Sequence, residues 1–305
     1  MIRDKINTVG KMQDYIKAHI NDSISLYDLA QSCGLSPWHT SRVFKELTGK
    51  NPFEYIRAIR LSQAALKLRD ERSKVIDVAL DFVFDSHEGF TRAFSREFGI
   101  SPKEYKKHTP PVKLFIPYRV MDSSQFKPEK KEIFMENEKT GCKTVAVFVQ
   151  VVERPARKMI TKRGVKATEY FKYCEEVGCD IWGILVSIKE ALYEPVGAWL
   201  PKGMIKKGTS QYIMGVEVPV NYQGQVPEGF EIIDLKPCKM MIFQGPPFKD
   251  EAFEGAIHDL WDVMKQYNPE IYGFKWADAD APRFQMEPQG YRGYIEGRPV
   301  RDIKA

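Results

Sequence analysis

Two stretches of the sequence place arginine, histidine and other polar side chains at helical spacing, a chemistry suited to reading nucleic-acid bases. Arg42 begins the run Arg-Val-Phe-Lys-Glu, and Arg92, 50 positions later, begins the similar run Arg-Ala-Phe-Ser-Arg-Glu. An arginine guanidinium can donate two hydrogen bonds to O6 and N7 of one guanine in the major groove of DNA. The residues expected to face DNA are Trp38, His39, Ser41, Arg42 and Lys45 in the first stretch and His87, Glu88, Thr91, Arg92 and Arg96 in the second.

These candidate contacts are not equivalent. Arg42 is the best placed for a guanine, while Trp38 lies near the helix end that enters the groove first. Trp38 could touch a thymine methyl group there, or could instead pack at a domain interface. His39 could bond a base or a phosphate. Glu88 could accept a hydrogen bond from cytosine N4, but DNA phosphates would repel it, so we expect the second stretch to read sequence less strongly.

Each stretch is predicted to be the second helix of a helix-turn-helix. Capping and helix-ending signals place the first one at residues 36–48, followed by Gly49, and a shorter helix at 26–33 precedes it. Residues 75–82 and 86–98 repeat this arrangement. Either copy alone could be two packed helices of any small bundle. The repeated caps, stops and outward arginine favour two helix-turn-helix units.

Longer helices are predicted to flank and join the two units. Residues 3–20 and 52–69 both have apolar side chains at helical spacing, and the second of these helices would be a stiff connector. Such a connector lets one chain contact two successive turns of the major groove, about 34 Å apart. On it, Arg57 and Arg60 could each reach a phosphate or pair with an acidic side chain.

Length and composition agree with this organisation. A chain of 305 residues is expected to form two domains. Residues 1–110 hold 18 Lys and Arg against 14 Asp and Glu, so most of the net charge of +5 lies there, as expected for a unit that approaches DNA. The five cysteines lack metal-ligand spacing, which indicates thiols in a reducing cytoplasm. No signal peptide and no run of 18 apolar residues is seen.

Several short motifs carry a family resemblance. They are Asp28-Leu-Ala, Gly34-Leu-Ser-Pro, Phe44-Lys-x-x-Thr-Gly, Tyr55-Ile-Arg-x-x-Arg-Leu, Ala79-x-x-x-x-Phe84, Phe90-Thr-Arg-Ala-Phe and Phe98-Gly-Ile-Ser-Pro-x-x-Tyr. With them, residues 5–107 resemble the AraC/XylS family of transcription regulators. The resemblance implies an all-helical DNA-binding domain at residues 1–108. It also implies a regulator, expected to be an activator, that binds two adjacent major-groove segments of duplex DNA and works with RNA polymerase.

The rest of the chain is predicted to be a linker at residues 109–142, with a short extended piece, and a second domain at 143–305. The run Arg157-Lys-Met-Ile-Thr-Lys-Arg-Gly is similar to Cys238-Lys-Met-Met-Ile-Phe-Gln-Gly, 81 positions later. The predicted helices are 168–188 and 251–267, and the predicted strands after them are 196–200, 211–218, 271–276, 283–287 and 291–296. The expected fold class is therefore multidomain: an all-α domain with two helix-turn-helix units, then an α+β domain of two strand-helix-strand-strand repeats about a pseudo-twofold axis.

Aromatic and acidic side chains of the second domain could form a cleft for an organic cation. Aromatic rings attract a cation, and a carboxylate adds selectivity for charge. The aromatic residues could instead be core, which is the preferred interpretation for Trp182 and Trp261 on apolar helix faces. The candidate ligand-binding residues are Trp199, Tyr212, Glu217, Trp276, Glu287, Tyr294 and Glu296, with Glu217 as the leading charge partner.

A second resemblance covers residues 143–301. Its motifs are Tyr212-Ile-Met-Gly-Val-Glu-Val, Gly229-Phe-Glu-x-x-x-Leu-x-Pro, Phe243-Gln-Gly-Pro and Pro299-Val-Arg. They resemble the GyrI-like effector-binding domain of Rob-like regulators, which implies a cleft for amphipathic organic compounds, commonly cations held by a carboxylate. Family members often place a glutamate at the position of Ile295. Glu296 is its neighbour, and because adjacent strand residues face opposite sides, Glu296 is not expected to replace it.

Three functions remain open. The preferred one is a sequence-specific DNA-binding transcription regulator whose second domain senses an amphipathic organic molecule, cationic or neutral. In the alternative, the second domain is a small-molecule hydrolase or a ligand-sequestering module; an architectural DNA binder is the third. The hydrolase has little support, because the second domain's single histidine, His258, lies beside Asp259 and Asp262 with no nucleophile. No catalytic residue, metal site or cofactor is predicted.

Overall fold

The computed structural model of the chain describes residues 2–120 and 145–303. The chain divides into two compact units, Met1–Lys139 and Thr140–Ala305. Among the described residues, no helix combines the length and the apolar character needed to cross a membrane.

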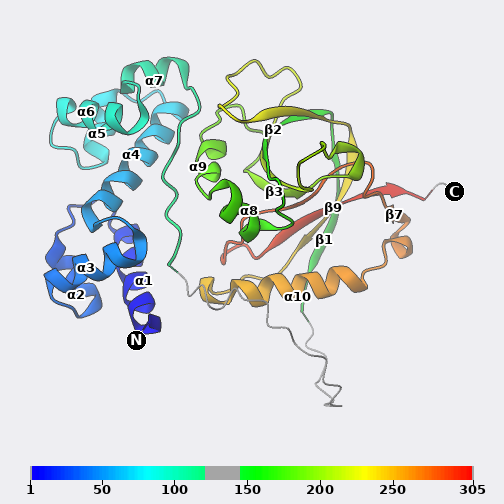
Figure 1. The fold of residues 1–305 in the computed structure, drawn as a ribbon, viewed down its shortest axis with the longest axis horizontal. Coiled ribbons are helices and arrows are strands. Elements are labelled where there is room, and N and C mark those ends of the chain that lie inside the picture. Colours follow the sequence, from blue (N-terminus) through cyan, green and yellow to red (C-terminus); the bar gives the residue numbers. More distant parts are fainter. Residues whose placement is uncertain (1, 121–144, 304–305) are drawn as a thin grey trace, which may run out of the picture. The chain divides into compact units, whose positions relative to one another are not determined.

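The first unit consists of helices, as the sequence predicts (Figure 1). Both second helices have the expected ends. Ser36 accepts a hydrogen bond from the backbone N–H of His39 and Ser86 from that of Gly89, while Gly49 and Gly99 close the two helices with φ of 73° and 72°. The helices are α1 (Ile2–Ala18), α2 (Leu26–Cys33), α3 (Pro37–Thr48), α4 (Pro52–Asp70), α5 (Val75–Asp81), α6 (His87–Phe98) and α7 (Pro102–His108).

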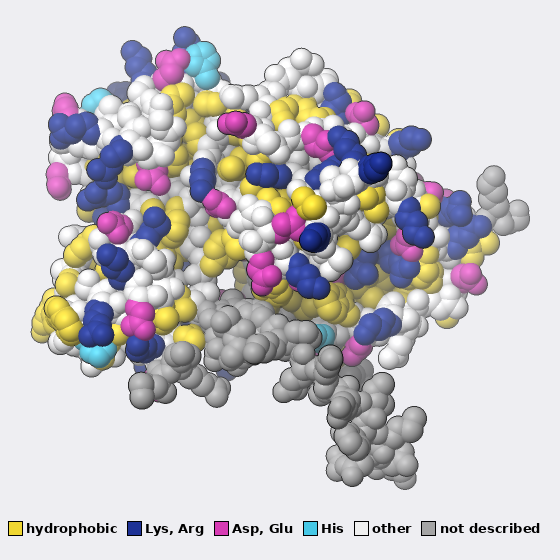
Figure 2. Space-filling view, in the orientation of Figure 1, with side chains coloured by type: hydrophobic (Ala, Val, Ile, Leu, Met, Phe, Trp, Pro, Cys, Tyr) yellow, Lys and Arg dark blue, Asp and Glu magenta, His cyan; other side chains and the backbone are white. Residues whose placement is uncertain are grey.

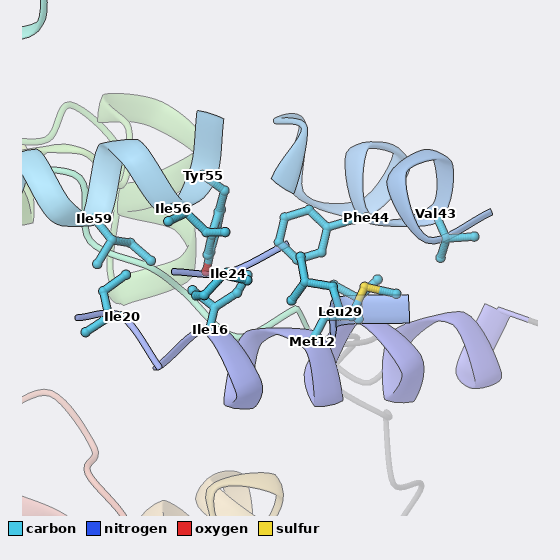
Figure 3. Packing of buried hydrophobic residues seen from close by; sticks show 11 residues of the cluster. Met12, Ile16, Ile20, Ile24, Leu29, Val43, Phe44, Tyr55, Ile56 and Ile59 are labelled. Atoms are coloured by element: carbon cyan, nitrogen blue, oxygen red, sulfur yellow. The ribbon is translucent and has the colours of Figure 1, made fainter. Parts of the chain in front are cut away.

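A hydrophobic core fixes the first helix-turn-helix against the helices on either side. Figure 3 shows Met12 and Ile16 of α1 close to Leu29 of α2, and Phe44 of α3 close to Tyr55 of α4. The rings of Phe44 and Tyr55 meet edge to face with their centres 5.1 Å apart. Because all five side chains are buried, the orientation of α3 is set by packing from both α1 and α4.

Of the two connector arginines, Arg60 donates hydrogen bonds to the backbone instead of pairing with an acidic side chain. Its Nε donates to the backbone oxygen of Ile20 (2.9 Å), and its Nη2 donates to the backbone oxygen of Asp22. It therefore ties the segment after α1 to the middle of α4. Arg57 is exposed on the same helix.

The chain after α7 is described as far as residue 120, and it packs on the helices of the first unit. The backbone N–H of Phe115 donates to Ser62 Oγ (2.7 Å), and that of Val120 donates to Gln13 Oε1 (3.0 Å). The Phe115 ring packs edge to face on Tyr55, with centres 5.1 Å apart. Residues 112–120 thus lie along α1 and α4 in an irregular conformation. The remainder of the predicted linker, residues 121–142, lies outside the described residues.

The second unit is a nine-stranded antiparallel sheet with helices packed on it (Figure 1). The strand order is β1-β6-β9-β8-β3-β4-β2-β5, and β7 pairs with β9. The strands are β1 (Phe148–Arg154), β2 (Arg157–Arg163), β3 (Val196–Trp199), β4 (Tyr212–Val218), β5 (Glu231–Leu235), β6 (Cys238–Gln244), β7 (Phe274–Trp276), β8 (Arg283–Gln285) and β9 (Ile295–Asp302). The helices are α8 (Tyr170–Val177), α9 (Ile181–Val186) and α10 (Phe253–Gln266), with short 3-10 turns at Lys202–Met204, Asp250–Ala252 and Pro269–Tyr272.

Three predicted elements differ from the structure. The strand expected over residues 271–276 begins only at Phe274, after the 3-10 turn at Pro269–Tyr272. The helix expected over residues 168–188 is broken into α8 and α9, because Gly178 takes φ of 102° and ends α8. The strand expected over residues 291–296 begins only at Ile295 and runs to Asp302. The later start of β9 leaves Tyr294 just outside the strand and Glu296 within it.

Both groups of helices lie against the same face of the sheet. Tyr173 of α8 contacts the ring of Tyr212 on β4, with ring centres 5.7 Å apart, and Leu260 and Met264 of α10 pack with Phe243 on β6. Residues paired across two antiparallel strands share a face of the sheet, and so do alternate residues of one strand. By these pairings one face carries Tyr212, Trp199, Arg283, Glu296 and Phe243. This face is therefore where α8 and α10 could enclose a site.

Candidate functional site

The first candidate surface is the exposed side of α3. Trp38 is 70% exposed at the start of the helix, and the guanidinium of Arg42 lies 5.5 Å from the centre of its ring. His39 and Lys45 are also exposed, while Ser41 is half-buried. Glu46, which follows one turn after Arg42, is paired with Lys5 (2.6 Å), and this hydrogen bond lowers the pKa of its carboxyl group. Arg42 makes no hydrogen bond or ion pair with any residue that the structure describes, so its guanidinium is available.

The second candidate surface is the matching side of α6. His87, Glu88, Arg92 and Arg96 are exposed, as expected. Thr91 differs from the expectation, because its side-chain oxygen is buried and has no hydrogen-bond partner in the described part of the chain. The α6 surface is thus built from the two arginines, His87 and Glu88. Figure 2 shows Lys and Arg side chains mixed with Asp and Glu over the helical unit. The visible face therefore has no large patch of one charge, and positive charge is found at individual arginines and lysines.

The sheet of the second unit brings together a buried carboxylate and several donors. Glu296 on β9 has no exposed surface. Its Oε1 accepts hydrogen bonds from the Tyr294 hydroxyl (2.7 Å) and from Trp261 Nε1 of α10, and its Oε2 accepts from Nε (2.9 Å) and Nη2 of Arg283 on β8. Each carboxylate oxygen therefore has two donors. Such saturation is what allows a charged carboxylate to remain buried.

Aromatic rings surround this carboxylate. Trp199 and Tyr212 meet edge to face with centres 5.2 Å apart, and the Arg283 guanidinium lies 4.8 Å from the centre of the Trp199 ring. Gln285 donates to the Tyr212 hydroxyl (3.0 Å), and its Oε1 lies 3.2 Å from the Tyr294 hydroxyl. Burial raises the pKa of both tyrosines well above its ordinary value, so both hydroxyls stay protonated at neutral pH.

Of the sequence-predicted ligand residues, the structure gathers Trp199, Tyr212, Tyr294 and Glu296 in one place. The expectation that Glu296 would face away is wrong, because the pairing of β9 with β8 puts it opposite Gln285, on the face that carries Trp199. That register could not be read from the sequence. Glu296 is therefore the carboxylate beside these rings.

The leading candidate of the sequence analysis, Glu217, lies elsewhere. It is five residues from Tyr212 on β4, so the two side chains point to opposite faces of the sheet. There it is buried against two arginines, with Arg157 Nε 2.8 Å from its Oε2 and Arg154 Nη2 on the same oxygen. Arg154 in turn lies 4.0 Å from the ring centre of Tyr193. Glu217 is thus held in a separate ionic cluster.

Trp276 and Glu287 are also outside the group around Glu296. Trp276 packs on Phe243 in the core under α10, and the Arg298 guanidinium lies 4.1 Å from its ring centre. Glu287 lies near Glu194 and Arg292, and burial raises the pKa of its carboxyl group.

Three residues at the site were not predicted as site residues: Arg283, Gln285 and Trp261. Trp261 was assigned to the core from its helix face, although its indole N–H reaches Glu296. The alternation of Arg283 and Gln285 on one predicted strand could have placed both on one face. His258, the histidine of a possible hydrolase, is exposed on α10 with Nδ1 2.9 Å from the backbone oxygen of Glu254.

Comparisons with known proteins cover the two units unequally. Residues 29–108 match a family model described as a helix-turn-helix domain. The transcriptional regulator Rob of Salmonella typhimurium is 34% identical over 119 residues, which are 36% of this chain and 41% of the relative. The HTH-type transcriptional activator AarP of Providencia stuartii is 39% identical over 98 residues, which are 32% of this chain and 73% of the relative.

The match to the first of these relatives thus spans only about two fifths of its length. Among solved structures, one described as SAV2435 bound to tetraphenylphosphonium matches 50% of this chain and 94% of its own, at 14% identity and a TM-score of 0.35.

Proposed function

The chain belongs to the AraC/XylS family of helix-turn-helix transcription regulators, and we propose that α3 and α6 both read base edges in the major groove of one promoter site. The observation that carries this proposal is the matched pair Arg42 and Arg92. Both are exposed at equivalent positions, and neither makes a hydrogen bond or ion pair with a residue that the structure describes. An uncommitted guanidinium is suited to a bidentate contact with guanine. The other expected contacts, Thr91 excepted, remain part of the proposal.

The arrangement of the two helix-turn-helix units within the first unit supports a single DNA-binding module. The connector α4 has 19 residues, or roughly 28 Å at 1.5 Å per residue, and it packs on both sides. A connector of that length is compatible with readers in successive major grooves. We propose that the module comprises residues 1–108 together with the packed segment 112–120. RNA polymerase stays the expected partner, and activation the expected sign of regulation.

Binding of the full-length chain to its own promoter DNA, measured by fluorescence anisotropy across a salt series, tests this proposal. Affinity should fall steeply with salt, because phosphate contacts release counterions. Arg42→Ala should weaken specific binding by about 1–3 kcal/mol. Arg72→Ala is the matched control, since Arg72 is exposed but lies between α4 and α5. Equal losses for the two variants, or binding that does not respond to salt, would contradict the proposal.

For the second unit, we propose a small-molecule sensor whose ligand binds at Glu296, Trp199 and Tyr212. A buried carboxylate beside aromatic rings is suited to an amphipathic organic ligand. The sheet pairing supports the doubled unit from which such a site was expected: Arg154 pairs with Cys238, and Leu235 pairs with Arg157. The two pairs are related to each other by the offset of 81 residues seen in the sequence repeat, since Leu235 lies 81 positions after Arg154 and Cys238 lies 81 positions after Arg157.

Thermal unfolding of the full chain against a panel of amphipathic compounds tests the sensor proposal. A ligand that binds the native protein raises the melting temperature, and the increase grows with the logarithm of its concentration above Kd. Trp199→Ala and Tyr212→Ala should remove the effect, while Tyr193→Ala, on the opposite face beside Arg154, should keep it. If a ligand raised the melting temperature of both variants as much as that of the wild type, its binding site would lie elsewhere.

A further inference from the structure

The site around Glu296 already contains a cation, and it comes from the chain itself. The Arg283 guanidinium donates twice to Glu296 Oε2 and lies 4.8 Å from the centre of the Trp199 ring. A buried carboxylate below and an aromatic face beside it are the two features that hold an organic cation. Arg283 therefore fills both parts of such a site at once.

The two partners of this ion pair differ in their access to water. The side chain of Glu296 is fully buried, whereas that of Arg283 is 35% exposed. Glu296 is also fixed from the other side by Tyr294 and Trp261, which bond its second oxygen. The carboxylate is consequently the rigid partner. Arginine has a long flexible stem, so its head can move into solvent without disturbing the sheet.

We propose that Arg283 is the resident counter-cation of the ligand site, and that a cationic ligand binds only by displacing its guanidinium into solvent. This rests on the proposed sensor function of the second unit. It gives the site a definite preference: a neutral ligand can pack on Trp199 with the ion pair intact, but a cation must compete with Arg283 for Glu296. The wild-type chain is thus selective against organic cations, although it has the carboxylate and rings that would favour them.

The displacement also provides a change that a bound ligand could transmit. Arg283 lies on β8, which joins the two halves of the sheet through its pairing with β3 and β9. A ligand that releases Arg283 from Glu296 frees a guanidinium at this junction, whereas a neutral ligand leaves it in place. Neutral and cationic ligands are therefore expected to leave the sheet in two different states of this ion pair.

Chemical rescue tests whether the place of Arg283 is a cation site. In Arg283→Ala, the full-length chain keeps Glu296 but lacks its cation, and millimolar methylguanidinium should raise the melting temperature by refilling the place. The wild type should not respond. Arg298→Ala is a close control, because Arg298 also lies over a tryptophan (4.1 Å from the Trp276 ring centre) and pairs with Asp278, but its partner is exposed. No rescue of Arg283→Ala, or equal rescue of both variants, would overturn the proposal.

Selectivity is tested with two probes of nearly the same outline, the cation 1-methyl-4-phenylpyridinium and the net-neutral 4-phenylpyridine N-oxide, by isothermal titration calorimetry. The wild type should bind the neutral probe at least as tightly as the cation. Arg283→Met should bind the cation at least about tenfold more tightly than the wild type does, which is 1.4 kcal/mol, with little change for the neutral probe. The double variant Arg283→Met/Glu296→Gln carries no unpaired buried charge and should lose this gain.

The outcomes separate the two proposals. If both probes bind and Arg283→Met leaves their ratio unchanged, Arg283 is not the counter-cation, although the ligand site stands. If the wild type bound the cation tenfold or more tightly than the neutral probe, Arg283 would likewise not be the counter-cation. If neither probe binds any form and methylguanidinium still rescues Arg283→Ala, the cation place is real but the proposed sensor site is not supported.

Discussion

Gly34 and Val83 hold the same left-handed backbone conformation at the turns of the two helix-turn-helix units. Gly34 has φ of 70°, and Val83 has φ of 60°. The bond after each is also the same, since Leu35 N–H donates to the Ala30 oxygen and Phe84 N–H donates to the Ala79 oxygen, both at 3.0 Å. A glycine adopts this conformation freely, whereas a β-branched residue does so at a cost of about 1–2 kcal/mol. The second turn is therefore strained.

Val83→Gly is expected to stabilise the first unit by about 1 kcal/mol, because relief of the left-handed strain exceeds the backbone entropy that glycine adds. Val83 is only half-buried, so little packing is lost. Denaturant unfolding of the full chain, followed on the transition of the helical unit, measures the change. The reciprocal variant Gly34→Val should destabilise by a similar or larger amount. A loss of stability in Val83→Gly would show that Val83 packing outweighs the strain.

The two reading helices are expected to contribute differently to specificity. Arg42→Ala should relax the preference at one base pair, while Arg92→Ala should weaken binding with a smaller change in preference, because Glu88 next to it is repelled by phosphate and limits close approach. Binding to a set of promoter variants with single base-pair changes measures both effects. If Arg92→Ala changed the preference more than Arg42→Ala, α6 would be the stronger reader.

Ser62 should couple residues 112–120 to the stability of the DNA-binding unit. It is buried on α4, and its Oγ accepts the only hydrogen bond that the structure gives to the Phe115 N–H among the described residues. Ser62→Ala would leave that half-buried N–H without its partner, at a cost of about 1 kcal/mol. Hydrogen exchange should show faster exchange at the Phe115 amide in particular. Ser73→Ala is the control, because the Ser73 hydroxyl makes a solvent-exposed hydrogen bond to Glu71, and the substitution should change the stability little.

Glu287 should make the second unit less stable as pH rises. Burial raises the pKa of its carboxyl group in the folded state, so the unfolded chain loses the proton at lower pH than the folded one. Stability then falls as pH increases from the ordinary carboxyl range through the raised pKa, and Glu287→Gln should be more stable than wild type at pH 7 but not at pH 4. Thermal unfolding at both pH values measures this. Glu228→Gln, at an exposed carboxylate, should show no such difference.

The parts of the fold that sequence predicts are those governed by local signals. Ser36 and Gly49 mark the ends of α3 through caps that depend only on neighbouring residues, and the repeat 50 positions later locates α6 in the same way. The site around Glu296 depends instead on which residues of β8 and β9 pair. A shift of one residue reverses the face of every side chain, which is why Glu217 was preferred to Glu296. The partner Arg283 could be recognised only once that pairing was known.

Tyr294 and Tyr212 are two fully buried tyrosines with hydroxyl groups in the same network. Tyr294 donates to the charged Glu296 (2.7 Å), whereas the Tyr212 hydroxyl accepts from the neutral Gln285 (3.0 Å). Hydrogen bonds to charged groups contribute about 1.5–3 kcal/mol and neutral ones about 0.5–1.5 kcal/mol. Tyr294→Phe should therefore lower the free energy of unfolding of the second unit more than Tyr212→Phe does. The substitutions remove the same atom at equal burial, so their difference in denaturant unfolding compares a hydrogen bond donated to a carboxylate with one accepted from an amide. If Tyr294→Phe cost no more than Tyr212→Phe, the charge of Glu296 would add nothing to the stability that its bond with Tyr294 contributes.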